Sequence, residues 1–196
     1  MLYVGTDNGA YVSFDSGISW QIFTKNLPNV AVHDLVIQPT AKHLILGTHG
    51  RSLYKADIGN LQLVTSELMN KKFHIFKIND IQKRNNWGAP RNDWSEAFEP
   101  EITIPFYASL NKKGVLQKMF VQIYSNDIRV NSKLYFASDG YNEFTFDLSF
   151  SEEGRNDFEK NHKNTKIEKA KNGKFYLPKG TYTVKIGDEK ATFEIK

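Results

Sequence analysis

The chain has 196 residues and a formal net charge of +4, and aromatic residues make up 13% of it. It contains no cysteine, which excludes disulfides, thiolate metal ligands and cysteine nucleophiles. Its start lacks the pattern of a signal peptide, and no apolar run approaches the roughly 20 residues of a membrane span. We therefore expect no membrane span. Basic residues are mixed with acidic ones, so we also expect no nucleic-acid partner.

Short strand patterns separated by turn signals fill the first 57 residues. Apolar, β-branched and aromatic runs predict strands over 2–5, 10–14, 18–23, 32–38, 44–47 and 52–56. Asn8-Gly9 and residues 15–17 supply hairpin turns. Strands this short, repeated at roughly 8–12 residues, indicate a sandwich, barrel or propeller.

An internal repeat supports a propeller. The segment 2–11 aligns with 44–54, because both read three apolar residues, Gly-Thr, a glycine turn and then Tyr. The period of about 42 residues is typical of propeller blades.

The most specific motif covers residues 13–20, which read Ser-Phe-Asp-Ser-Gly-Ile-Ser-Trp and match the Asp-box pattern Ser-x-Asp-x-Gly-x-Ser/Thr-Trp. We assign Ser13, Asp15, Gly17 and Trp20 a structural role in this motif. Asp15 is expected to accept backbone N–H bonds across the turn, and Gly17 to take a positive φ. Trp20 is expected to pack under the hairpin. The motif stabilises a fold and identifies no chemistry.

The rest of the chain reads as a connector and a second β unit. We predict a connector over 59–100, with one strand over 73–78 and an ordered loop after it. Further strands are predicted over 101–107, 119–124, 133–136, 143–148, 181–186 and 191–195. The highly charged stretch 151–172 is expected to form an exposed excursion with one or two helical turns.

Residues 2–57 resemble the final blades of exported bacterial proteins with Asp-box (BNR-repeat), sortilin-like propellers, many of which are labelled glycosyl hydrolases. Residues 139–148 and 180–184 resemble the strand pattern of the immunoglobulin-like domain of flagellar hook-capping proteins, which follows the propeller in such proteins. The resemblance implies an all-β chain: a partial β-propeller of about one and a half blades over 1–58, then the connector, then an immunoglobulin-like β-sandwich over 101–196. It also implies an extracellular, cell-surface or periplasmic location.

A propeller needs roughly four to eight blades, so blades upstream in a longer protein, or another protein, are the expected partners. Exposed strand edges also make self-association a candidate.

We predict no catalytic residue, no cofactor and no metal site. Glycosidases need a pair of carboxylates, and no pair is marked out here. Asp34 beside His33 could serve a hydrolase or could simply make a strand-end hydrogen bond. Arg51 is the only arginine in the blade region, which rules out the arginine cluster of a sialidase. The histidines lack the spacing of a metal site.

Two groups are candidate ligand-binding residues. His49 and Arg51 flank Gly50 on a predicted face loop, where ligand contact and a simple tight turn are both open. The connector carries Arg84, Trp87, Arg91 and Trp94. Such residues can stack on sugar faces, or they can fill an interface between domains with Arg stacked on Trp.

We therefore predict a non-catalytic binding or interaction module. Two alternatives stay open: an accessory C-terminal region of a glycoside hydrolase whose catalytic residues lie upstream, and a carbohydrate-binding module that acts through the tryptophan loop.

Overall fold

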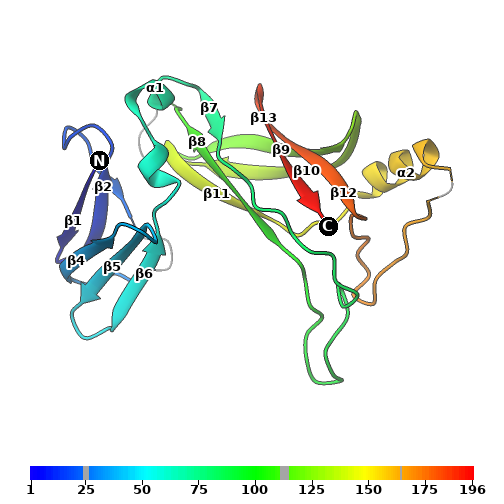
Figure 1. Cartoon of the computed structure of the whole chain (residues 1–196), viewed down its shortest axis with the longest axis horizontal. Helices are drawn as coiled ribbons and strands as arrows, with labels where there is room; N and C mark the ends of the chain where they lie inside the picture. The colour runs from blue at the N-terminus through cyan, green and yellow to red at the C-terminus, as the bar shows by residue number, and fades with distance from the viewer. Residues whose placement is uncertain (24–26, 111–114, 164) are drawn as a thin grey trace. The chain divides into compact units, whose positions relative to one another are not determined.

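The computed structural model describes residues 1–23, 27–110, 115–163 and 165–196. Strands account for 45% of the residues and helices for 9%, and the described residues form no closed barrel. The prediction of an all-β chain is confirmed. The chain divides into two compact units, Met1–Lys71 and Lys72–Lys196, each of which is described by itself (Figure 1).

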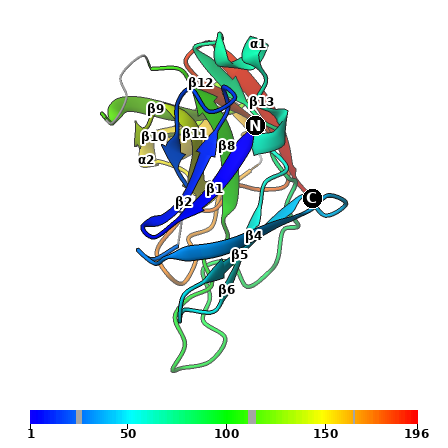
Figure 2. The same ribbon diagram turned by 90° about the vertical axis from the view of Figure 1, so that its left-hand side faces the viewer.

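Two three-stranded antiparallel sheets build the first unit, and Figure 2 shows both of them. The first sheet contains β1 (Leu2–Thr6), β2 (Gly9–Ser13) and β3 (Gln21–Ile22). The second contains β4 (Val32–Gln38), β5 (His43–Thr48) and β6 (Leu53–Asp57). The sequence repeat therefore falls on two equivalent hairpins, β1–β2 and β5–β6.

The two sheets of the first unit come close together at Gly5. A Cβ atom added to Gly5 would lie only 2.6 Å from the carbonyl oxygen of Val32 on β4. Buried apolar side chains, among them Val12, Leu44 and Leu46, form the core of this unit. Glycine at position 5 thus lets β1 approach β4 closely, since any side chain would displace the backbone.

Two short helical segments close the first unit. The 3₁₀ turn η1 (Leu61–Leu63) is followed by α1 (Ser66–Met69), whose N-cap Thr65 accepts a hydrogen bond from the backbone N–H of Leu68. Leu61 and Leu68 are buried. The pattern of strands therefore ends at β6, in agreement with the break at Ile58-Gly59-Asn60.

The second unit consists of two antiparallel sheets that share one hydrophobic core. One sheet has the order β11-β8-β7 and contains β7 (Phe73–Ile75), β8 (Ile102–Ala108) and β11 (Gly140–Phe146). The other has the order β10-β9-β12-β13 and contains β9 (Gln117–Ser125), β10 (Ile128–Ala137), β12 (Gly180–Ile186) and β13 (Glu189–Ile195). Phe106 on β8 meets Tyr135 on β10 edge to face, with ring centroids 5.6 Å apart, so the core joins both sheets.

The expected helical turns in the charged stretch form one helix, α2 (Glu152–Asn161). The Ser151 side chain caps it by accepting from the backbone N–H of Gly154, and two glutamates occupy its first turn, where they complement the helix dipole. Gly154 packs against the backbone of Val130, so the start of α2 covers the start of β10.

The segment after β7 is fastened to the last strand. Ile81 forms a parallel bridge with Ile195, and its N–H donates to the Glu194 carbonyl over 2.9 Å. The N–H of Lys83 donates to the Lys196 carbonyl over 2.7 Å. These bonds position the loop that leads to β8. The loop extends away from the two sheets of this unit (Figure 1).

Three strand predictions need correction. The strand predicted over 73–78 ends at Ile75. The third strand is confined to Gln21–Ile22 because the residues before it are used by the Asp-box turn. The strand predicted over 133–136 begins earlier, at Ile128, and passes through a bulge between Arg129 and Asn131. In the described part of the chain, neither α2 nor any other helix has the length and apolar character to cross a bilayer.

Candidate functional site

Hydrogen bonds within the Asp-box turn involve three of its predicted residues. The Ser13 hydroxyl donates to the Asp15 carboxylate and accepts from the N–H of Gly17, each over 2.8 Å. The N–H of Ser19 also donates to Asp15 over 2.8 Å. Gly17 has a φ of 95°. Trp20 is 43% exposed, and its ring lies 3.8 Å from the position that a Cβ atom on Gly17 would take. These contacts fix the corner that joins β2 to β3.

Protonation of Asp15 should weaken this turn. Hydrogen bonds from the hydroxyl and the backbone N–H of Ser19 lower the pKa of Asp15 from 3.8 to about 2. A folded pKa below the unfolded one stabilises the fold above the unfolded pKa, and this contribution disappears as pH falls through the folded pKa. We expect the first unit to lose stability between pH 3.8 and about 2, and Asp15→Asn to remove this dependence. Trp20 fluorescence in an acid titration measures it.

Asp7→Asn is the matched control for that titration, since Asp7 lies at the exposed tip of the β1–β2 hairpin. This variant should keep the acid dependence of the wild type. An Asp15→Asn variant that loses stability in parallel with the wild type would contradict the role of the carboxylate.

His49 and Arg51 lie on the turn between β5 and β6 in the first unit. Gly50 has a φ of 71°, which confirms that it supplies the unusual backbone angle. His49 and Arg51 flank it, and the His49 ring stacks on His33 with centroids 5.2 Å apart. Asp34, beside His33, accepts from the N–H of Leu35 over 2.8 Å. The two candidate residues thus lie on a tight turn, and the stacked rings of His33 and His49 connect this turn to β4.

The other four candidate residues, Arg84, Trp87, Arg91 and Trp94, lie in the second unit, on the stretch that we call the tryptophan loop (residues 84–98). The base of the loop is a narrow hairpin, in which the N–H of Phe98 donates to Ala89 over 3.0 Å and the N–H of Gly88 donates to Phe98 over 2.7 Å. Near the tip, Asn92 accepts from the N–H of Trp94 over 3.1 Å. Backbone and side-chain hydrogen bonds therefore hold the loop in a defined shape.

The two tryptophans of the loop have opposite surroundings. Trp87 is 6% exposed, with its ring 5.9 Å from Tyr176 and the Lys83 ammonium 4.1 Å above it. Trp94 is 97% exposed. Trp87 therefore anchors the loop to the core, while Trp94 presents its whole indole to solvent.

Lys83, whose ammonium lies over the Trp87 ring, is itself partly buried. Its ammonium donates to the carbonyl of Leu177 over 2.7 Å, and burial lowers the pKa of Lys83 to about 8. The carbonyl and the indole face both favour the charged form, because each presents negative potential to the ammonium.

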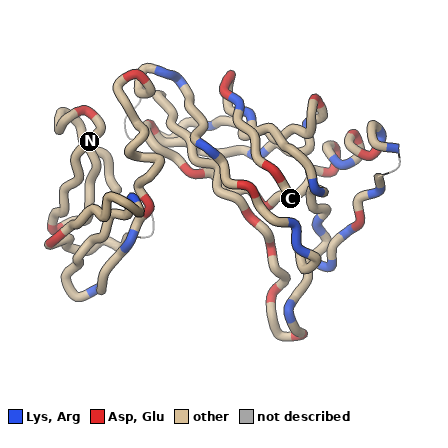
Figure 3. The backbone as a smooth tube through the Cα atoms, viewed as in Figure 1, with Lys and Arg blue, Asp and Glu red and all other residues tan. Residues whose placement is uncertain are grey.

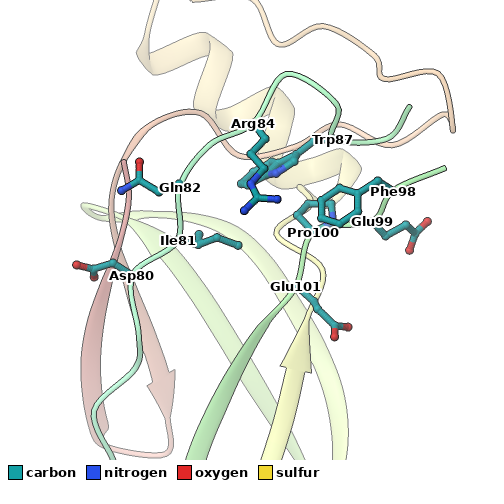
Figure 4. Close-up of a pocket in the computed structure, with 9 residues that line it drawn as sticks. All are labelled: Asp80, Ile81, Gln82, Arg84, Trp87, Phe98, Glu99, Pro100 and Glu101. Carbon is teal, nitrogen blue, oxygen red and sulfur yellow. The ribbon is translucent and has the colours of Figure 1, made fainter. Parts of the chain in front are cut away.

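A pocket of about 390 Å³ opens at the base of the loop. It is lined by Asp80, Ile81, Gln82, Arg84, Trp87, Phe98, Glu99, Pro100 and Glu101, and Figure 4 shows these side chains, with Arg84, Trp87 and Phe98 among them. The pocket combines an aromatic wall with charges of both signs.

Two of the four charged residues that line the pocket are already paired. Glu99 binds Lys174 over 2.8 Å, and Asp80 binds Lys196 over 2.6 Å. The guanidinium group of Arg84 has no hydrogen-bond or ion-pair partner among the described residues. The pocket thus offers a guanidinium group beside an aromatic surface.

Sequence reasoning named Arg84 and Trp87 as candidate ligand-binding residues but missed the other seven residues that line the pocket, among them Phe98, Pro100 and Glu101. These three precede β8, and only the hairpin at the base of the loop brings them beside Arg84. Arg91 is exposed on the loop and does not line the pocket. A single aromatic residue before a strand carries no signal that could have identified Phe98.

Comparisons of the chain with protein-family models, with curated proteins and with solved structures each find no match. The geometry of these residues is therefore the basis for any functional conclusion.

Proposed function

We propose that this chain is a non-catalytic binding module whose tryptophan loop contacts the partner. We also infer that the two sheets of the first unit are parts of adjacent propeller blades, and that the second unit is an immunoglobulin-like sandwich. The repeat on hairpins β1–β2 and β5–β6 supports the blades, and the common core of two antiparallel sheets supports the sandwich.

One observation carries the binding function: the 97% exposure of Trp94 at the tip of a hydrogen-bonded loop. Tryptophan exposes a large apolar area, so leaving it in water is costly, and it is enriched among residues that dominate binding energy. The loop is held at its base by buried Trp87, so little conformational entropy is lost when Trp94 is covered.

Placing a photo-crosslinking amino acid, p-benzoylphenylalanine, at position 94 tests this proposal. Irradiation of the producing cells should yield a covalent adduct. The same amino acid at position 18 should not, although Ile18 is 88% exposed on the first unit. The absence of an adduct at 94, or equal adducts at both positions, would refute the loop as the contact.

Trp94→Ala should weaken the affinity for the crosslinked partner by about 30-fold or more, as expected for a tryptophan hot spot. Because the side chain is almost fully exposed, the free energy of unfolding should change by less than about 0.5 kcal/mol. Titration calorimetry and urea unfolding measure the two quantities. A large stability loss would show that Trp94 is structural.

Carbohydrate is the second candidate partner, favoured by the flat exposed indole of Trp94 among the polar residues Arg91, Asn92 and Asp93. An oligosaccharide that stacks on Trp94 should quench its fluorescence, while Trp87 is shielded by burial. No quenching across a broad panel of oligosaccharides would remove this candidate and leave a protein partner.

A further inference from the structure

The β10 strand forms an open edge of the second unit. It is the terminal strand in the order β10-β9-β12-β13, and α2 covers only its beginning, where the Ser151 N–H donates to the Val130 carbonyl over 3.0 Å. From Ser132 to Ala137, no described residue outside β9 makes a backbone hydrogen bond to the strand. The opposite edge, β13, is paired with the segment at Ile81. An unpaired edge offers backbone donors and acceptors to a further strand.

Apolar side chains stand next to this open edge, on the outer face of the sheet. Leu134 on β10 lies directly opposite Phe120 on β9. Phe136 follows two residues after Leu134 on β10 and therefore lies on the same face. Phe120 is 55% exposed, Leu134 42% and Phe136 54%. Clustered apolar side chains on a surface are typical of a binding site.

Positive charge accompanies the edge. β10 contains Arg129 and Lys133 and no carboxylate residue. Arg129 is paired with Glu153 over 3.4 Å. Lys133 forms no ion pair with a described residue, although its charge attracts the carboxylate of Asp147. Elsewhere along the described backbone, residues of both signs are interspersed (Figure 3).

A second copy of the chain fits this edge poorly. Two β10 strands side by side would bring only cations together, and like charges on paired strands are destabilising. Three half-exposed side chains also supply much less than the roughly 800 Å² per partner of a stable interface. An extended segment needs less apolar area, because backbone hydrogen bonds supply much of its affinity.

We propose that β10 is a docking edge for an extended, acidic segment of another protein, which adds as a fifth strand to the sheet. Alternate side chains of a strand point to opposite faces. Apolar residues of the segment cover Leu134 and Phe136 on the outer face, and acidic residues reach Lys133, which alternation places on the other face. This site is separate from the tryptophan loop and does not depend on it.

The probe for this site is a fluorescein-labelled peptide of ten residues in which Val and Glu alternate. Fluorescence anisotropy with the full chain should show binding. A Val-Lys peptide should not bind, and a Val-Glu peptide with N-methylated backbone should bind at least about tenfold more weakly, because it cannot pair as a strand. Absence of Val-Glu binding, or equal binding of the N-methylated peptide, would overturn the proposal.

Charge reversal identifies the position of the peptide. Lys133→Glu should weaken Val-Glu binding about tenfold and allow the Val-Lys peptide to bind. Lys190→Glu, the same change on β13, should leave binding unaltered, and equal losses in the two variants would refute docking at β10. Lys133→Gln repeats the test with a smaller loss if the reversed charge prevents folding.

Three further measurements distinguish an added strand from a second copy of the chain and from a lipid surface. A chain that sediments as a dimer, and returns to a monomer in Phe136→Asp, would show that a second copy fills the edge and would overturn the proposal. If the chain binds phosphatidylserine vesicles but not the peptide, and Phe136→Asp removes the vesicle binding, the edge binds a lipid surface and the proposal is overturned. Trp94→Ala should bind the peptide as the wild type does, so the docking edge and the tryptophan loop can fail independently.

Discussion

Phe106→Ala is expected to destabilise the second unit by about 3–5 kcal/mol, the usual cost of removing a phenyl ring from a packed core. Phe106 is 0% exposed, lies on the central strand β8 and contacts Tyr135 from the opposite sheet. The lost ring would leave a cavity between two sheets that cannot collapse without breaking their hydrogen bonds. Urea unfolding, followed by the fluorescence of buried Trp87, measures the loss.

Phe136→Ala is the matched control, because it removes the same side chain from a position that is 54% exposed on the same unit. It should cost no more than about 1 kcal/mol, as expected for a surface change. Equal losses for the two variants would mean that the apolar centre of this unit does not lie between its two sheets.

Gly88→Ala is expected to destabilise the base of the tryptophan loop by about 2–4 kcal/mol, from backbone strain and overpacking together. Gly88 has a φ of 73°, and an added Cβ would lie 2.5 Å from the Ala170 side chain and 2.8 Å from the Tyr176 ring. Its N–H donates to Phe98, and its carbonyl accepts from Asn172 over 2.9 Å. The substitution should therefore also expose Trp87, which a red shift of its fluorescence would report.

Gly50→Ala separates the two causes. Gly50 has a similar φ of 71°, but nothing lies within 4 Å of an added Cβ. This control should cost only the strain of a left-handed residue, roughly 1–2 kcal/mol. If Gly88→Ala costs no more than Gly50→Ala, the contacts with Ala170 and Tyr176 do not limit the site.

Local patterns were sufficient to predict most strands. The apolar and β-branched residues over 32–38, followed by Pro39, predicted a strand that the structure places at Val32–Gln38. The Asp-box motif predicted that Asp15 accepts a backbone N–H across the turn, which Ser19 donates, and that Gly17 has a positive φ, since both depend on residues close in sequence. Turns and alternating strands are encoded within a few residues, so a sequence reveals them directly.

The early part of β10 escaped prediction because long-range contacts maintain it. Asn131 and Ser132 interrupt the apolar pattern, and a bulge shifts the register beside them. Asn131 is 2% exposed and donates to the Ser149 carbonyl over 2.6 Å. A buried polar residue is stable when it has such a partner, and the partner lies in a segment that sequence periodicity cannot connect to it.

In the tryptophan loop, the sequence determines one set of properties and the tertiary structure another. The sequence by itself determined that residues 84–94 hold two tryptophans and two arginines without a strand or helix period, which predicted an ordered, aromatic loop. It could not distinguish Trp87 from Trp94, because both follow polar residues in an irregular segment. Contacts with Tyr176 and Lys83 bury Trp87, and the hairpin at Ala89 and Phe98 carries Trp94 out into solvent. Burial is set by which distant segments meet, and that is decided only by the tertiary structure.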